Sequence, residues 1–146
     1  MIAINHRSRN ETYEVLTHLL DTDICIYAMK SRDFRLSKKL ESLRDHTAVS
    51  DVTLFELYYG AQKYAEPDRR LAIVNDFASQ VVILPFDTRA ANYAGPLRHN
   101  LEKQGLTIGV YDFLIAGIAL AHNLTLMTNN VREFKRVPGL NVEKWG

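Results

Sequence analysis

One short stretch constrains the fold more than any other. An apolar run that begins at Val15 ends abruptly at the carboxylate of Asp21, and Thr22 and Asp23 follow directly. Such a run is typical of a central strand in a parallel sheet, which is buried on both faces. Ligands of open α/β sheets bind beyond the carboxyl ends of the strands, which is where Asp21 would lie. The structural alternative is that Asp21 or Asp23 caps the next helix, the commoner role for a single strand-end aspartate.

Short apolar runs and amphipathic helical segments alternate along the rest of the chain. We expect strands at 15–21, 47–50, 81–84 and 124–127, and a last edge strand from Leu140, Val142 and Trp145. We expect helices at 22–30, 36–43, 52–65, 68–80, 88–103 and 110–121, and a short helical turn around Glu133 and Phe134. This alternation predicts an α/β fold in which helices cover both faces of a parallel sheet, giving three layers.

Three local features of these helices can be predicted as well. Asp51 or Thr53 is the expected cap of the helix at 52–65. Asp87 precedes the helix at 88–103 and has a sufficient explanation as its cap. Pro96 is expected to kink or split that helix, because proline lacks the N–H group that a helix interior requires.

Length and composition favour one globular domain over 15–146. The chain has 146 residues, 47% hydrophobic and 24% charged, which is ordinary for a soluble protein with a single core. A formal charge of +1 excludes a strongly basic surface overall, so any nucleic-acid-binding face must be local. The lone Cys25 fits a reducing cytoplasm, and no apolar run approaches the length of a membrane span. Residues 1–14 are interpreted as a polar extension that could be disordered.

Acidic residues recur at, or just after, the predicted strand ends. They are Asp21, Glu56, Asp112 and either Asn130 or Glu133 at the fourth position. The carboxyl ends of parallel strands share one edge, so these oxygen ligands would repel one another unless protonated or bridged by a hard cation. Mg²⁺ or Mn²⁺ suits such a site, which would support metal-assisted hydrolysis of phosphodiesters. The alternative for Glu56 and Asp112 is that each stabilises the start of its helix.

Other chemistries find less support in the sequence. The five histidines lack the spacing of zinc ligands, and Cys25 lies among apolar residues as a core cysteine would. There is no glycine-rich dinucleotide motif, phosphate-binding loop or nucleophile-elbow motif. The seven tyrosines fall mostly on apolar helix faces, so we expect them in the core or at an interface before base-stacking roles.

Four stretches together carry a family resemblance: HLLDTDICIY, SDVTLFELYYGA, IGVYDFLIAGIALAHNLTLMTNNVREF and VPGLNVEKW. In this order and spacing they resemble the PIN-domain nucleases, and most closely the VapC-type toxins of bacterial toxin–antitoxin pairs. The resemblance implies an α/β/α fold with a five-stranded parallel sheet and an endoribonuclease that depends on Mg²⁺ or Mn²⁺. It also implies a homodimer and a VapB-type antitoxin that occludes the site.

The resemblance assigns roles to particular residues. It implies metal-binding acids at Asp21, Glu56 and Asp112, and supporting polar residues at Thr22, Thr128 and Asn130. Many PIN domains have aspartate where this chain has Asn130. Toxins with the TNN form carry their fourth acid at the place of Glu133, so we favour Glu133 as the fourth catalytic and metal-binding acid.

The resemblance also suggests a substrate, since VapC toxins of this type cut initiator tRNA in the anticodon stem-loop. RNA, and tRNA first, is therefore the expected substrate class. Candidate phosphate contacts are Arg132, Lys135 and Arg136, with Lys38 and Lys39 as further candidates that could equally be a solvated helix face. One rival is a degenerate PIN domain that binds RNA or protein without catalysis. A relative of the flap nucleases is the other rival, but those enzymes are longer and carry more acids.

Overall fold

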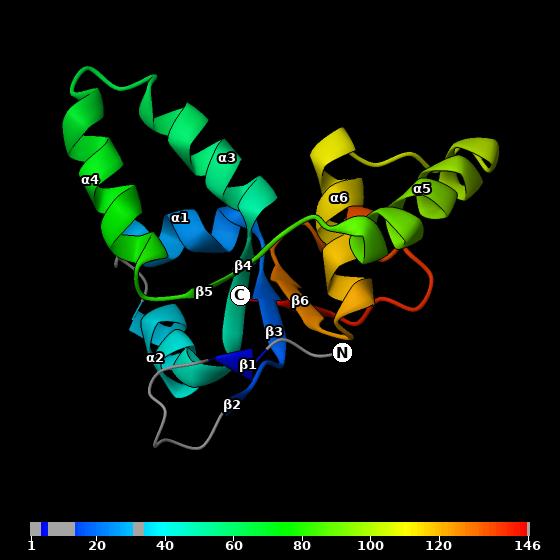
Figure 1. Ribbon diagram of the computed structural model, residues 1–146, viewed down its shortest axis with the longest axis horizontal. Helices are drawn as coiled ribbons and strands as arrows, with labels where there is room; N and C mark the ends of the chain where they lie inside the picture. The colour runs from blue at the N-terminus through cyan, green and yellow to red at the C-terminus, as the bar shows by residue number, and fades with distance from the viewer. Residues whose placement is uncertain (1–3, 6–13, 31–33, 146) are drawn as a thin grey trace.

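Five parallel strands form the central sheet, in the order β5-β4-β3-β6-β7. The computed structural model describes residues 4–5, 14–30 and 34–145 (Figure 1). The strands are β3 (His18–Leu20), β4 (Thr47–Ser50), β5 (Val82–Leu84), β6 (Thr125–Thr128) and β7 (Val142–Lys144). Leu20 of the central β3 pairs with Val49 on one side and Met127 on the other, so three strand ends lie in register. The expected three-layer α/β fold with a five-stranded parallel sheet is confirmed.

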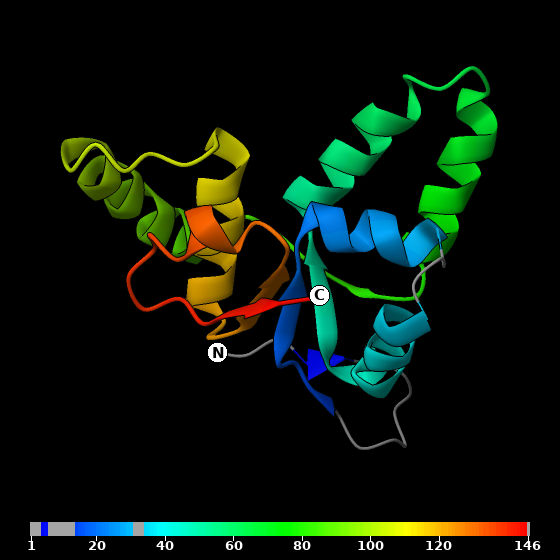
Figure 2. The ribbon, with the colours of Figure 1, turned by 180° about the vertical axis from the view of Figure 1, so that it is seen from behind.

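Two groups of helices cover the two faces of the sheet (Figures 1 and 2). One group is α1 (Thr22–Lys30), α2 (Phe34–Ser42), α3 (Asp51–Ala61) and α4 (Pro67–Ala78). The other is α5 (Thr88–Lys103), α6 (Val110–Ala121) and α7 (Val131–Phe134), and a short 3₁₀ turn, Arg44–His46, precedes β4. Successive strand residues point to opposite faces, so Leu20 packs with the first group and Leu19 with the second.

The second layer depends on close packing between α5 and α6. Gly117 lies where these helices touch, and a Cβ atom there would come within 2.7 Å of the Ala90 carbonyl oxygen and 2.9 Å of the Ala94 Cβ. Only glycine therefore fits at this crossing without movement of the backbone. The contact holds α6, which carries Asp112 in its first turn, against the sheet.

Several element boundaries differ from the prediction. The segment at 15–21 divides: β2 (Glu14–Val15) pairs antiparallel with β1 (Ile4–Asn5), and only His18–Leu20 joins the main sheet. Helix α3 ends at Ala61 rather than at residue 65. Pro96 lies inside α5, which remains one helix and is not split. The expected disorder of residues 1–14 falls outside the described residues, apart from Ile4–Asn5 and Glu14.

The predictions of the two helix caps had different outcomes. The Asp87 carboxylate accepts a hydrogen bond from the Ala90 amide at 2.9 Å, which confirms Asp87 as the cap of α5. The predicted cap of α3 was wrong, because the Ser50 hydroxyl accepts the bond from the Thr53 amide, also at 2.9 Å. The Asp51 carboxylate instead accepts from the backbone amide of Phe86. In the parts of the chain that the structure describes, no helix combines the length and apolar character needed to span a membrane.

Candidate active site

Asp21 lies at the carboxyl end of the central strand, with only 6% of its surface exposed. Its Oδ1 accepts a hydrogen bond from the Thr22 amide at 2.8 Å, and its Oδ2 accepts one from the Thr128 hydroxyl at 2.7 Å. Burial raises the pKa of Asp21 to about 6. The Thr128 hydrogen bond opposes that rise, and the nearby charges of Asp23 and Glu56 add to it. The carboxylate is therefore held in a fixed orientation in surroundings that disfavour its charge.

Glu56 reaches the same edge of the sheet from α3. Its Oε1 accepts a hydrogen bond from the Thr22 hydroxyl at 2.8 Å. The Thr22 oxygen lies 3.1 Å from the buried Thr53 hydroxyl, which donates to it because the Thr22 proton is already used. Thr22 thus connects the start of α1 to the first turns of α3. The sequence suggested Thr53 only as a helix cap and gave no sign of this contact, because its partner lies 31 residues earlier in the chain.

Asp112 and Glu133 face each other from the starts of α6 and α7. Burial is the largest cause that raises the pKa of Asp112 to about 7, followed by the charges of Asp21 and Glu133, a hydrogen bond with Glu133, and the charge of Glu56. Two carboxyls this close repel each other when both are charged, which disfavours the charged form of Asp112. A Cβ on Gly109 would lie 3.0 Å from the Asp112 Oδ2, so the glycine leaves the space that this carboxyl occupies.

Asn130 contacts Glu133 directly. The Asn130 side-chain amide donates a hydrogen bond to the Glu133 Oε2 at 2.9 Å, and its backbone amide donates to the Thr128 hydroxyl oxygen at 2.9 Å. Each of the three polar residues predicted to support the site thus contacts one acid: Thr128 with Asp21, Thr22 with Glu56, and Asn130 with Glu133.

The four carboxyls are close enough for the charges of three of them to raise the pKa of Asp112. Carboxylate oxygens are the hard donors that Mg²⁺ and Mn²⁺ prefer, so the donor chemistry fits such an ion. Across the described ranges, however, no three acidic, histidine or cysteine side chains are already grouped as ligands for one ion. Each carboxylate oxygen keeps a second lone pair beside the hydrogen bond that it accepts, so an ion can bind while the contacts from Thr22, Thr128 and Asn130 are kept.

The candidate RNA-binding cations differ in where they lie and in whether another group already binds them. Arg132 and Lys135 are exposed on and just after α7. The Arg136 guanidinium donates a hydrogen bond to the Thr107 carbonyl oxygen at 2.7 Å, which ties it to the loop before α6. Lys39 forms an ion pair with Glu143. Its helix α2 lies toward the amino ends of the strands, away from the acids (Figure 1), so a structural role fits Lys39 better than phosphate binding.

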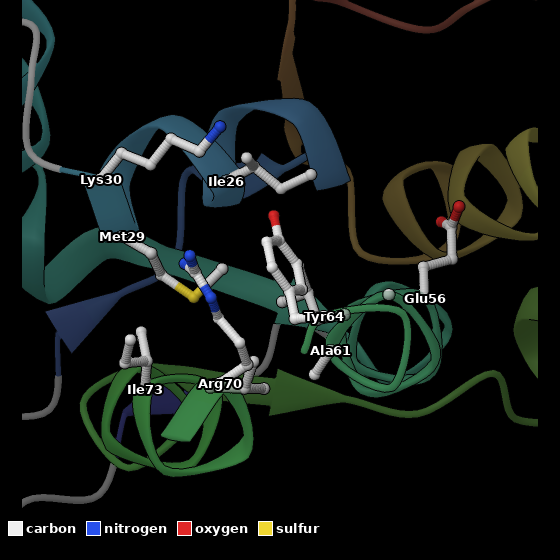
Figure 3. Close-up of a pocket in the computed structure, with 11 residues that line it drawn as sticks. Ile26, Met29, Lys30, Glu56, Ala61, Tyr64, Arg70 and Ile73 are labelled. Atoms are coloured by element: carbon white, nitrogen blue, oxygen red, sulfur yellow. The ribbon is translucent and has the colours of Figure 1, made fainter. Parts of the chain in front are cut away.

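A pocket of about 270 Å³ lies between α1, α3 and α4, with Glu56 in its lining. Figure 3 shows Glu56 at one end, on the side of α3 away from the other labelled residues. Apolar side chains make much of the wall, including Ile26, Met29 and Ile73. Lys30 and Arg70 supply positive charge, and the Arg70 guanidinium lies 4.0 Å from the centre of the Tyr64 ring.

Two further outcomes concern side chains that the sequence placed differently. Cys25 is fully buried, which confirms it as a core residue. The tyrosines were expected in the core or at an interface, and exposure excludes the core for five of them: Tyr27, Tyr59, Tyr64, Tyr93 and Tyr111. An interface role for these five stays a prediction. Asp23, considered above as a cap, accepts a hydrogen bond from the Asn129 amide at 3.0 Å and so links α1 to the segment after β6.

Comparison with known proteins places this geometry in context. Residues 18–140 match the family described as PIN domain. The chain is 39% identical to the tRNA(fMet)-specific endonuclease VapC of Salmonella typhimurium over 131 residues, covering 90% of this chain and 99% of that protein. The chain is also 39% identical to ribonuclease VapC2 of Haemophilus influenzae over 131 residues, covering 90% of this chain and 99% of that protein.

Solved structures give the same result. The DNA-bound VapBC from Salmonella typhimurium matches with a TM-score of 0.86 at 39% identity, covering 90% of this chain and 99% of that one. VapBC2 from Rickettsia felis, bound to a fragment of promoter DNA, matches with a TM-score of 0.84 at 38% identity, covering 90% and 100%.

Proposed function

The chain belongs to the PIN-domain family, in its VapC-type branch, and we propose that it is a Mg²⁺- or Mn²⁺-dependent endoribonuclease toxin. The observation that carries the proposal is the meeting of Asp21, Glu56, Asp112 and Glu133 at one edge of the sheet, where their charges act on one another. In a family of nucleases, a carboxyl cluster that raises the pKa values of Asp21 and Asp112 is better explained by a catalytic site than by four separate helix caps. RNA is the proposed substrate, and tRNA is the first class to test because a relative carries that specificity in its name.

The four acids would hold the ion, with Glu133 as the fourth ligand in preference to Asn130. When bound, a divalent ion lowers the pKa of a coordinated water and neutralises charge that develops on the phosphate. The threonines contribute by orientation: Thr128 fixes Asp21, and Thr22 fixes Glu56. Asn130 does the same for Glu133. Partners of this kind keep ligand oxygens directed at the site and raise affinity for an ion.

The solvent-exposed cations complete the proposed substrate surface. Arg132 and Lys135 lie within two residues of Glu133 in the sequence and are free to approach phosphates. Arg136 is proposed to act mainly by holding the loop at 104–109, since its guanidinium already donates to Thr107. With a formal charge of only +1 on the chain, this local positive charge has to counter the repulsion between the acids and RNA.

A cognate VapB-type antitoxin is the proposed protein partner, since similar chains were solved as VapBC complexes. The pocket between α1, α3 and α4 offers a place for apolar antitoxin side chains, and Lys30 and Arg70 favour acidic groups beside them. Glu56 lies at one end of the same lining, so a segment bound there would have to extend past α3 to cover the catalytic edge. A homodimer is also part of the proposal, and light scattering at micromolar concentration tests it.

Incubation of the purified chain with RNA, in Mg²⁺ or Mn²⁺ and then in EDTA, tests the function. We expect cleavage only with the ion, and products with 5′-phosphate and 3′-hydroxyl ends, because water and not the ribose 2′-hydroxyl attacks. RNA that is bound but never cut, with either ion, would instead identify a non-catalytic PIN domain.

A further inference from the structure

Three aromatic side chains form a continuous exposed row beside the acids. Phe55, Tyr59 and Tyr111 are 52%, 58% and 45% exposed. The rings of Phe55 and Tyr59 are nearly parallel, 10° apart with 6.4 Å between their centres, and Phe55 meets Tyr111 edge to face at 5.6 Å. Lys63 extends the row, with its Nζ 4.4 Å from the centre of the Tyr59 ring. We call these three rings the aromatic row.

The rings of the aromatic row are neighbours of the proposed catalytic acids in the sequence. Phe55 immediately precedes Glu56 on α3, and Tyr111 immediately precedes Asp112 on α6. Successive residues of a helix are rotated by about 100°, so Tyr59 lies on the same stripe as Phe55 and Glu56 borders that stripe. The contact between Phe55 and Tyr111 bridges the two acid-bearing helices. The rings and the acids occupy adjacent positions on the same two helices, which places the rings within reach of a polymer bound at Glu56 and Asp112.

Charge alone is a weak source of affinity for RNA at this place. The acids repel phosphates, and the chain carries a formal charge of only +1. Exposed aromatic rings bind nucleic acid in another way, because any unpaired base can stack on them regardless of sequence. Such stacking requires the base to be out of a duplex.

We propose that Phe55, Tyr59 and Tyr111 stack the unpaired bases that flank the scissile phosphate and so position the RNA strand over the acids. This inference rests on the proposed RNA cleavage and adds the residues that hold the bases. Lys63, at the end of the row, is placed to contact the backbone of the same strand. The pocket between α1, α3 and α4 remains the proposed binding site of the antitoxin.

The test measures kcat/KM of the intact chain on an unpaired oligoribonucleotide in Mg²⁺. Tyr59→Leu and Tyr111→Leu keep an apolar side chain and remove the ring. The matched control is Tyr93→Leu on α5, since Tyr93 is similarly exposed at 42%. Stacking typically contributes enough for a loss of roughly 5- to 150-fold per ring. We expect such a loss for the two row variants and less than twofold for the control.

A double-mutant cycle with the RNA separates stacking from other causes. Abasic sites are placed one at a time beside the scissile bond that the wild type cuts. Removal of the stacked base should slow the wild type by the same factor as loss of the ring, and should slow the ring variant no further. These ring effects should change little with salt, unlike effects on phosphate contacts.

Two results would overturn the proposal. One is an additive effect of abasic site and ring removal, or no effect of either row variant, while the wild type still cuts RNA. The other is a Leu variant that converts a dimer to a monomer in light scattering and cuts intact and abasic RNA equally poorly, which would assign the row to a contact between copies. If the wild type cuts no RNA with either ion, the proposed function itself has failed, and this outcome is distinct from the first two.

Discussion

Replacing Asp21 by asparagine should abolish RNA cleavage and yet stabilise the ion-free protein. The pKa of Asp21 rises from its ordinary value of 3.8 to about 6, chiefly through burial. That difference means that the charged carboxylate costs the folded state about 3 kcal/mol near pH 7.5. Asparagine can still accept from the Thr22 amide, and its NH₂ group can donate to the Thr128 hydroxyl. Allowing about 1 kcal/mol for the weaker hydrogen bonds leaves a gain of about 2 kcal/mol.

The sign of this effect reverses the usual behaviour of a salt-bridged aspartate. The folded chain keeps the Asp21 proton up to about pH 6, whereas the unfolded chain loses it near 3.8. The cost is therefore absent below pH 3.8, grows between these values and is complete above about pH 6. Thermal unfolding in EDTA should show Asp21→Asn with a Tm roughly 6–10 °C above wild type near pH 7.5. The two Tm values should converge near pH 4.

Added Mn²⁺ and a capping control complete the experiment. The ion should raise the Tm of the wild type and leave that of Asp21→Asn unchanged, because a ligand stabilises only a state that binds it. Asp87→Asn should keep full activity and an almost unchanged Tm, since asparagine caps helices about as well as aspartate. An Asp21→Asn variant that unfolds at a lower Tm than wild type near pH 7.5, while its folded fraction still cuts RNA, would refute the reasoning and make Asp21 a cap.

Three other predictions concern the support of the site. At limiting Mg²⁺ the cleavage rate should rise between about pH 6 and 8, because protons and the ion compete for Asp112, whose pKa is about 7. Saturating Mg²⁺ should move this rise to lower pH. Thr128→Val removes the donor to Asp21 and should weaken ion binding by about 10- to 100-fold, measured by Mn²⁺ titration, with Asp87→Asn unaffected. Gly117→Ala forces a Cβ against the Ala90 carbonyl and should cost about 1–3 kcal/mol of unfolding free energy in urea; an unchanged midpoint would show that α5 and α6 separate easily.

Features set by local chemistry could be predicted from the sequence. Asp21 follows a buried run directly, and Asp87 caps the very next residues, so neither depends on distant contacts. The prediction of the cap of α3 was wrong because three residues within four positions have side chains that can cap a helix: Ser50, Asp51 and Thr53. The β4 strand carries the Ser50 hydroxyl to the start of the helix, while Asp51 bonds to Phe86 from another strand end.

Features set by tertiary packing could not be predicted in the same way. The pairing of Asp112 with Glu133 joins two helices, and the bond from Arg136 to Thr107 spans 29 residues. Helical periodicity predicts which face of a helix a residue lies on, but not which other element packs against that face. The exposure of Tyr59 and Tyr111 could therefore be learned only from the structure. Val15 shows the same limit, because an apolar run cannot tell the main sheet from the separate pair of β1 and β2.

The most direct test of the catalytic claim is the rate of RNA cleavage as a function of Mn²⁺ concentration, compared between wild type and Asp112→Asn. The account predicts no cleavage in EDTA, a saturable rise with Mn²⁺ for the wild type, products ending in 5′-phosphate, and no activity for the variant at any concentration. Cleavage that persists in EDTA, 2′,3′-cyclic phosphate ends, or an active Asp112→Asn would contradict it.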